Sequence, residues 1–156
     1  MKIKYIKSKI LLSLFLLMII GGVLSAENEN FIISDEPLII TQGYGIQENG
    51  SFHHGIDIAI PEGIKIINQQ YGVVTKAEYN NIYGLTVMID YGDIEALYGH
   101  NSKLLVNKGD KVTPNQIISL SGSTGNSTGN HLHFEIRKNN KAINPYQYLN
   151  SQINKE

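Results

Sequence analysis

The sequence predicts an all-β domain of the antiparallel sandwich or barrel type. The main indication is a series of short apolar runs that recur about every 8 to 12 residues and are separated by turn residues. The composition agrees, because 15 glycines and nine tyrosines accompany a charged fraction of 17%, below the roughly 25% of a typical soluble domain. No segment has a long helical period, so we expect helix only as one closing turn at residues 145–149.

Eight segments have the length and the residue types of strands. Turn residues such as Pro61-Glu62-Gly63 and Lys108-Gly109-Asp110 interrupt the apolar runs. The repeated Ser-Thr-Gly-Asn of residues 123–130 is too short for a structural repeat and predicts a polar loop. The expected strands are residues 38–41, 56–60, 64–68, 72–78, 85–91, 94–98, 116–121 and 132–138.

The first 25 residues have the order of a secretory signal. A basic segment precedes an apolar run at residues 10–24, and small residues follow it. The apolar run is shorter than the ~20 residues that a spanning helix needs, so we expect a signal peptide, with an uncleaved membrane anchor as the alternative. In both cases the domain works outside the cytoplasm. We divide the chain into a leader (1–25), a short polar lead-in (26–36), one domain (37–150) and a tail (151–156).

Charge and cysteine content exclude several classes of function. The leader holds four of the 13 basic residues and no acidic residue, so residues 26–156 carry nine basic and 14 acidic groups, a net charge of −5. The chain has one arginine, Arg137, and no basic cluster after the leader, so we expect no nucleic-acid partner. The absence of cysteine excludes disulfides, thiol nucleophiles, cysteine-ligated zinc and a lipoprotein anchor.

Strand alternation places a histidine and a carboxylate on one face of residues 53–60. Ile56 and Ile58 belong to an apolar face, and because side chains alternate along a strand, His53 and Asp57 share the opposite face. Gly55 lies between them and is expected to leave room for an ion.

The same alternation predicts a second polar face on residues 131–137. Leu132 and Phe134 lie on the apolar face, which leaves His131, His133 and Glu135 on the other one. The two segments together therefore offer several potential metal ligands.

These residues fit a zinc site with an open position. Such a site needs three nitrogen or oxygen ligands and a place for water. His53, Asp57 and one imidazole of the His131/His133 pair supply that set, and calcium or magnesium would need more oxygen ligands. The remaining imidazole of the pair is close enough to take a proton from a bound water. His100, at a strand end, adds a polar group to the same cleft.

Other polar residues have simpler explanations. His54 falls on the isoleucine face, which favours a packing or rim position, and Glu135 is expected to support the site or lie at the surface. Tyr44, in Gln42-Gly43-Tyr44-Gly45, is by default a packed turn residue. Residues 122–130 lack the lysine of a phosphate-binding loop, so the sequence does not support nucleotide binding.

Three motifs taken together resemble those of the lysostaphin-type (LytM-like) zinc endopeptidases of bacterial cell walls. They are His53-His54-Gly55-Ile56-Asp57, Tyr98-Gly99-His100 and the segment 122–135 with its His131-Leu132-His133. The resemblance extends from about residue 39 to 148. It implies a sandwich- and barrel-like hybrid fold of the duplicated-hybrid-motif type.

The resemblance also implies roles for individual residues. His53, Asp57 and His133 match the ligands of one Zn²⁺ per chain, His131 matches the general base, and His100 matches the histidine that assists at the transition state. Tyr44 is the nearest counterpart of a substrate-contacting tyrosine. Two departures do not touch a ligand: Asn130 replaces a frequent proline, and Asn115 stands where glycine is common.

We therefore expect residues 37–150 to be a secreted or membrane-tethered zinc metalloendopeptidase. Its substrates are peptide bonds in the stem peptides or crossbridges of peptidoglycan, and its tether would be residues 10–24. An alternative is an envelope scaffold of the sporulation-channel or amidase-activator type that binds a protein partner. A carrier domain, suggested by the turn Gly109-Asp110-Lys111-Val112, fits poorly with a leader and an aspartate ligand.

Overall fold

The domain consists of antiparallel sheets in the part of the chain that the computed structural model describes, residues 33–34 and 39–153. These residues belong to the second of two units, Ile32–Glu156. The predicted leader lies outside the described residues, as does most of the lead-in. Ile33 of the lead-in is buried, and its carbonyl accepts a hydrogen bond from the Ile67 amide.

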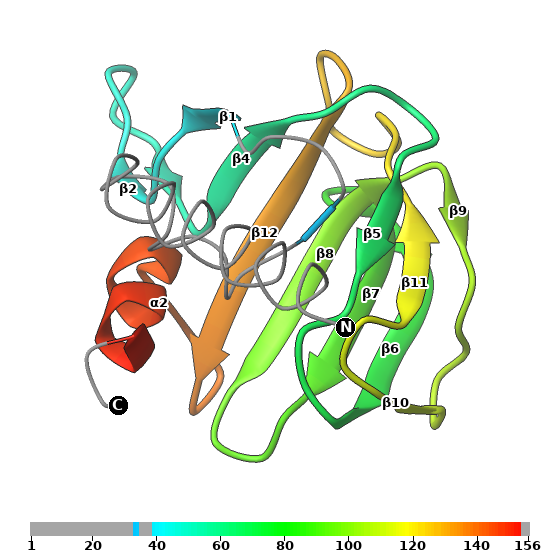
Figure 1. The fold of residues 1–156 in the computed structure, drawn as a ribbon. Helices are drawn as coiled ribbons and strands as arrows, with labels where there is room; N and C mark the ends of the chain where they lie inside the picture. Colours follow the sequence, from blue (N-terminus) through cyan, green and yellow to red (C-terminus); the bar gives the residue numbers. More distant parts are fainter. Residues whose placement is uncertain (1–32, 35–38, 154–156) are drawn as a thin grey trace, which may run out of the picture. The chain divides into compact units, whose positions relative to one another are not determined.

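The largest sheet contains eight of the strands (Figure 1). Its order is β1-β4-β12-β8-β7-β6-β10, and β13 pairs with β12. The strands are β1 (Ile39–Gln42), β4 (Ile56–Ala59), β6 (Gly72–Asn80), β7 (Gly84–Asp90), β8 (Glu95–Asn101), β10 (Lys111–Val112), β12 (His131–Lys138) and β13 (Lys141–Ile143). All neighbours in this sheet are antiparallel.

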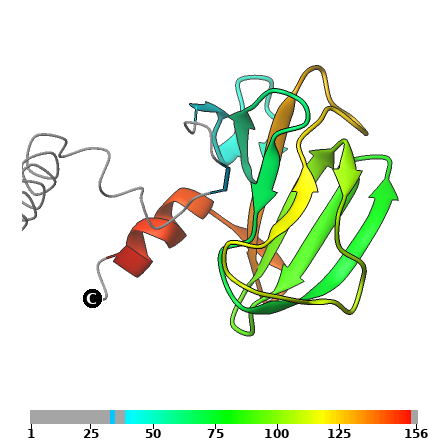
Figure 2. The same cartoon turned by 45° about the vertical axis from the view of Figure 1, so that its right-hand side comes forward.

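A smaller sheet lies over β6, β7 and β8, as Figure 1 and Figure 2 both show. It contains β5 (Lys65–Ile67), β9 (Lys103–Leu104) and β11 (Ile117–Leu120), in the order β5-β11-β9. Ile66 and Ile118 of this sheet and Val87 and Ile89 of the large sheet are fully buried. Burial of these apolar side chains between the layers is the main stabilising term of a sandwich.

The structure confirms the predicted all-β class and the strand pattern of the sequence. The strands that sequence analysis missed are the short ones: β9, β10, β13 and the hairpin of β2 (Gly45–Ile46) and β3 (Phe52–His53). Elements of two or three residues show little alternation, and β5 was the only one of them that was predicted, as part of residues 64–68.

The predicted closing turn is a longer helix, α2 (Pro145–Ile153). Asn144 caps it, because its Oδ1 accepts hydrogen bonds from the amides of Tyr146 and Gln147. Pro145 follows at the first helical position, which needs no amide donor. Among the described residues, no helix combines the length and the apolar character of a membrane span.

The register of β12 brings the sequence motifs together. Its His133 is paired with Asp57 of β4 on one side and with Gly99 of β8 on the other. Directly opposed residues of an antiparallel pair point to the same face of the sheet. One face carries the buried Ile56, Ile58, Leu132 and Phe134, and the other carries the polar residues of the predicted site.

Candidate active site

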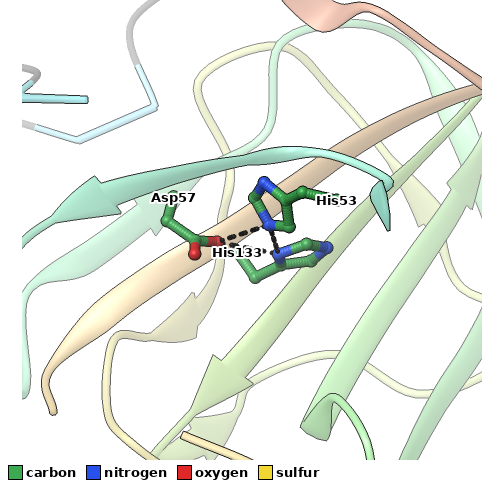
Figure 3. Close-up of side chains that lie close together, drawn as sticks. All are labelled: His53, Asp57 and His133. Atoms are coloured by element: carbon green, nitrogen blue, oxygen red, sulfur yellow. Dashed lines mark hydrogen bonds and ion pairs between the residues drawn. The ribbon is translucent and has the colours of Figure 1, made fainter. Parts of the chain in front are cut away.

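Three predicted ligands meet at the face of the sheet formed by β4 and β12 (Figure 3). His53 comes from β3, Asp57 from β4 and His133 from β12. The Oδ1 atom of Asp57 lies 3.2 Å from Nε2 of His53 and 2.8 Å from Nδ1 of His133. The two nitrogens lie 3.1 Å apart. This cluster could hold a metal ion.

The outer nitrogens of the two imidazoles are anchored by oxygen atoms. Nδ1 of His53 lies 2.9 Å from the Gly43 carbonyl, and Nε2 of His133 lies 3.0 Å from Oε1 of Glu135. Because both oxygens only accept, these partners assign the protons to the outer nitrogens. The lone pairs of the inner nitrogens then converge with the Asp57 carboxylate, an arrangement that needs a cation at its centre.

The donor set fits Zn²⁺. Two imidazole nitrogens and one carboxylate oxygen are ligands that zinc prefers, and calcium or magnesium would demand more oxygens. Two ligands of one tetrahedral zinc lie about 3.3 Å apart, given bonds of about 2.0 Å, which is close to the observed separations. Anchoring of the distal nitrogen by a carboxylate or a carbonyl is the usual support of a zinc-bound histidine.

Glu135 is the deepest charged group of the site and has 0% exposure. Burial raises the pKa of its carboxyl, but hydrogen bonds from His133, Tyr83 and Arg137 outweigh this and lower the pKa to about 2. The Tyr83 hydroxyl donates at 2.6 Å and Nε of Arg137 at 2.7 Å. Glu135 is therefore ionised, and it orients His133.

The ionisation of Asp57 and His133 follows from their mutual contact. Burial raises the pKa of Asp57, but the contacts with His133 and His53, which are favourable when these imidazoles are charged, outweigh this and hold the pKa well below its ordinary value. Burial lowers the pKa of His133, and the contacts with Asp57 and Glu135 outweigh this and raise it. A positive charge at the centre is thus favoured, whether a proton or a metal ion carries it.

His131 and His100 lie beside the donor cluster, which consists of His53, Asp57 and His133. Their ring centroids are 4.5 Å apart. Nδ1 of His131 lies 2.8 Å from the Gly129 carbonyl, and Nδ1 of His100 lies 2.7 Å from the Thr124 carbonyl. Each ring therefore presents Nε2 as its free basic atom, and that of His131 is 3.8 Å from Oδ1 of Asp57. Burial lowers the pKa of His100, which favours the neutral form of its ring.

An unusual backbone conformation turns His100 toward the cleft. Gly99 is paired with His133 and faces the site, so strict alternation would place His100 on the core side with the buried Tyr98. The φ angle of His100 is +61°, in the left-handed region that residues other than glycine seldom adopt. Its amide donates to the Tyr83 carbonyl at 2.6 Å. This turn allows a residue that alternation would place in the core to reach the site.

Gly55 has a different role from the one expected. A Cβ at this position would collide with the Phe134 carbonyl oxygen and lie 3.0 Å from Cγ of Glu135. The missing side chain therefore leaves room for the backbone of β12, and the expectation that it leaves room for an ion was wrong. The close approach of the two segments is what brings His53 and Asp57 next to His133.

The cluster lies in a cleft of about 530 Å³. Its floor is formed by β4, β12 and β8, and its walls by residues 49–54, the β6–β7 turn and the loop 126–128. The lining residues are Gln42, Asn49, Phe52, His53, His54, Asp57, Ile82, Tyr83, His100, Asn126, Ser127, Thr128, His131, His133 and Glu135.

The structure does not bring Tyr44 to the other predicted residues. Its hydroxyl donates to the Ala142 carbonyl at 3.0 Å, and its ring packs edge-on against Phe52. The substrate contact expected of Tyr44 therefore stays a prediction. His54 is exposed at the rim of the cleft. Sequence reasoning missed Tyr83, which lies in no recognisable motif. It also missed Thr124, which lies in the segment 122–135 but reaches His100 only through its carbonyl.

Comparison with known proteins decides the family. Residues 51–145 match the sequence profile of Peptidase family M23. The chain belongs to this family. M23 peptidases are zinc-dependent, and the His53–Asp57–His133 cluster is a possible metal site.

Curated relatives of this M23 chain include enzymes and a sporulation protein. It is 40% identical over 93 residues to the peptidoglycan DD-endopeptidase ShyA of Vibrio cholerae, covering 59% of this chain and 22% of ShyA. It is 35% identical over 108 residues to stage II sporulation protein Q of Bacillus subtilis, covering 66% and 38% of the two chains. The match spans between 20% and 38% of the length of the first curated relatives.

Solved structures share the fold over most of the domain. The catalytic domain of EnpA from Enterococcus faecalis is 38% identical, with a TM-score of 0.67, and the match covers 72% of this chain and 92% of that one. The lysostaphin catalytic domain of Staphylococcus simulans is 33% identical, with a TM-score of 0.68 and the same coverage. SpoIIQ, in its complex with SpoIIIAH, is 28% identical, with a TM-score of 0.66 and coverage of 75% and 96%.

Proposed function

We propose that this chain is a zinc metalloendopeptidase that hydrolyses peptide bonds of peptidoglycan, in stem peptides or crossbridges. The observation that carries the proposal is the convergence of the His53–Asp57–His133 donor atoms with two further anchored imidazoles in one cleft. His53, Asp57 and His133 hold one Zn²⁺, with Glu135 and the Gly43 carbonyl fixing the tautomers of the two histidines.

The remaining histidines supply proton transfer and charge stabilisation. A zinc ion in this cluster supplies Lewis acidity, which makes water a nucleophile near neutral pH and polarises the scissile carbonyl. His131 accepts the proton of the attacking water at Nε2, because its Nδ1 is committed to the Gly129 carbonyl. The proton that His131 takes would pass to the leaving amine. His100, after taking a proton from solvent at Nε2, would donate a hydrogen bond to the oxyanion of the tetrahedral intermediate.

The cell envelope is the proposed place of action. A relative named as a peptidoglycan DD-endopeptidase and another named as a lipoprotein NlpD/LppB homologue, of Pseudomonas aeruginosa, support an envelope substrate. The basic and apolar order of residues 1–25 supports export. The enzyme would then be released after cleavage of the leader or remain tethered through residues 10–24.

A second candidate is an envelope scaffold that binds a protein partner. The likeness to SpoIIQ, whose structure was solved in complex with SpoIIIAH, favours it. The chain retains the two imidazoles outside the donor cluster, however, and a scaffold has no need of an anchored base. This supports catalysis as the main function.

Zinc content and wall clearing together test the proposal. The purified chain is loaded with zinc, its metal content is measured, and the turbidity of purified peptidoglycan is followed with and without a chelator. One zinc per chain with chelator-sensitive clearing is the expected result. One zinc without clearing of several wall types would favour the scaffold, and no bound zinc would overturn the proposed ligand set.

A further inference from the structure

Two consecutive residues exchange sides at the end of β8. Between Tyr98 and Asn101, β8 has one residue more than its partner β7, which makes a β-bulge, an irregularity that can re-aim a side chain. The left-handed φ of His100 lies in this bulge. As a result, the imidazole of His100 lines the cleft. Asn101, which strict alternation would place on the cleft face, has 0% exposure instead.

The buried carboxamide of Asn101 joins the bulge to both neighbouring layers. Its Nδ2 donates to the carbonyls of Tyr98 and Leu85, both at 2.7 Å. Its Oδ1 accepts a hydrogen bond from the Ser119 hydroxyl at 2.7 Å. Ser119 is itself fully buried and belongs to β11, in the smaller sheet that lies over β8 (Figure 1). Both polar atoms of the carboxamide therefore have partners, as a buried amide requires.

The backbone of Asn101 also supports the ring of His100. Its carbonyl accepts a hydrogen bond from the Thr124 hydroxyl at 2.6 Å, and the Thr124 carbonyl lies 2.7 Å from Nδ1 of His100. Asn101 is thus connected to the strand that precedes His100 and to the loop that holds its imidazole. Neither Asn101 nor Ser119 is among the described residues that line the cleft.

We propose that Asn101 is a positioning residue for His100, and that Ser119 of the smaller sheet fixes its carboxamide. Without this carboxamide, the carbonyls of Tyr98 and Leu85 lose a buried donor, and the bulge loses the hydrogen bonds that favour it over regular alternation. The imidazole then loses its fixed place in the cleft, on which its contribution to the reaction depends. This inference rests on the proposed function and extends the machinery of that site into the second sheet.

A second buried asparagine offers a matched control. Asn68 also has 0% exposure, and its Nδ2 donates to the carbonyls of Gln70 and Thr113 at 2.6 and 2.7 Å. Its Oδ1 accepts from the Tyr91 hydroxyl at 2.6 Å. Asn68 and Tyr91 thus repeat the contacts of Asn101 and its serine partner, but neither is among the described residues that line the cleft. The two sets separate positioning from stability.

The milder test removes the hydroxyl that contacts each asparagine. Kinetics on a defined peptide and zinc content are measured for the full-length Ser119→Ala and Tyr91→Phe variants. We expect Ser119→Ala to lower kcat about tenfold with KM and zinc content unchanged. Tyr91→Phe should leave kcat unchanged, although it also removes a contact with the Tyr98 hydroxyl at 3.0 Å. Equal kcat values for the two variants, or loss of zinc from Ser119→Ala, would overturn the inference.

The stronger test replaces each carboxamide by an apolar group of similar size. Asn101→Leu and Asn68→Leu should both unfold at lower urea concentration, because each leaves two buried carbonyls without a donor. Only Asn101→Leu should also lower kcat, by about a hundredfold. A kcat of Asn101→Leu that matches that of Asn68→Leu would contradict the positioning role. If Asn101→Leu does not fold, the comparison of Ser119→Ala with Tyr91→Phe decides.

Hydrogen exchange of the His100 amide provides a measurement that does not depend on turnover. This amide donates to the Tyr83 carbonyl, so its exchange rate reports how firmly the turn is held. We expect at least about tenfold faster exchange in Ser119→Ala than in Tyr91→Phe. If this difference is found but the zinc-loaded unmodified chain cleaves no peptide, the endopeptidase is contradicted and the positioning of His100 stands. If the chain cleaves and the two variants exchange at equal rates, the endopeptidase stands and the positioning is wrong.

Discussion

The donor cluster and the His100–His131 pair face the same cleft but are held in different ways. Asp57 and His133 are opposed residues of adjacent strands, so the regular pairing of β4 with β12 sets their distance. His100 is held by an irregular backbone angle and by a carbonyl of the loop 122–130, and His131 by another carbonyl of that loop. The proposed metal binding would thus depend on the sheet, and the proposed proton transfer would depend on the loop 122–130.

The largest effect is expected from a change in the sheet-held half of the site, the donor cluster of His53, Asp57 and His133. Asp57→Ala removes the oxygen that contacts both imidazoles of the cluster, and the two nitrogens left behind make an incomplete site. We expect zinc retention after dialysis to be lost and wall clearing to fall to background. Metal analysis of the folded variant checks this. A variant that still holds one zinc per chain would place the metal elsewhere.

Removing the base tests whether the two halves are separable. His131→Ala should retain zinc, because the donor cluster is complete without it, and should lower kcat by about 10²- to 10⁴-fold. Kinetics on a defined peptide and metal analysis of the same sample provide the measurement. Loss of zinc in this variant would show that the halves form a single unit, and an unchanged kcat would refute the role of His131.

Acid should weaken the sheet-held half through Glu135. Its pKa is lowered from an ordinary value of 4.5 to about 2, so the ionised carboxylate stabilises the folded state above pH 4.5. That contribution is lost as the pH falls toward 2, and it is of order 3 kcal/mol. Urea unfolding of metal-free protein between pH 6 and pH 2 measures it. Glu135→Gln should unfold more easily at pH 6 and depend less on pH, and equal slopes for the two proteins would contradict this assignment.

Thr124→Val perturbs only the loop-held half of the site, the His100–His131 pair. The Thr124 hydroxyl donates to the Asn101 carbonyl at 2.6 Å and accepts from the Leu85 amide at 2.9 Å. Its loss should destabilise the fold by about 1–3 kcal/mol and, by shifting the carbonyl that holds His100, lower kcat about tenfold. Zinc affinity should not change. Thr124→Ser keeps the hydroxyl and should restore kcat; failure of this rescue would mean that the hydroxyl does not position His100.

The smallest effect concerns Tyr44, which belongs to neither half. Tyr44→Phe removes its hydrogen bond to Ala142 and should lower the free energy of unfolding by about 1 kcal/mol, with kcat and zinc content unchanged. Thermal or urea unfolding measures the first quantity. A large loss of kcat with normal stability would instead support a direct contact of Tyr44 with substrate.

Strand alternation explains why much of this arrangement could be predicted from the sequence. The isoleucines at 56 and 58 and the apolar residues at 132 and 134 are buried as the period of two requires. That period also predicts that Asp57 and His133 lie on the opposite face, and the structure places their oxygen and nitrogen 2.8 Å apart. Their roles as metal ligands stay predictions.

Irregular contacts explain what could not be predicted. The position of His100 depends on a left-handed backbone angle at a residue that alternation would assign to the core. Tyr83 reaches the site because it hydrogen-bonds to Glu135, 52 residues later. The structure explains the departure at Asn115, where glycine is common in the family. The φ angle of this residue is +64°, a conformation that glycine adopts readily and that asparagine also tolerates.

The early end of the β8–β12 ladder makes the space for His100 and His131, where the proposed chemistry would take place. The two strands pair up to Gly99 and His133 and then separate. Beyond that point the His100 amide donates to the Tyr83 carbonyl and the His131 amide to the Gly122 carbonyl, so each strand has a new backbone partner. The gap between the strands holds the imidazole rings of His100 and His131. A small β-domain can therefore form a candidate active-site cleft without an internal void, because redirected hydrogen bonds open the sheet while its core stays closed.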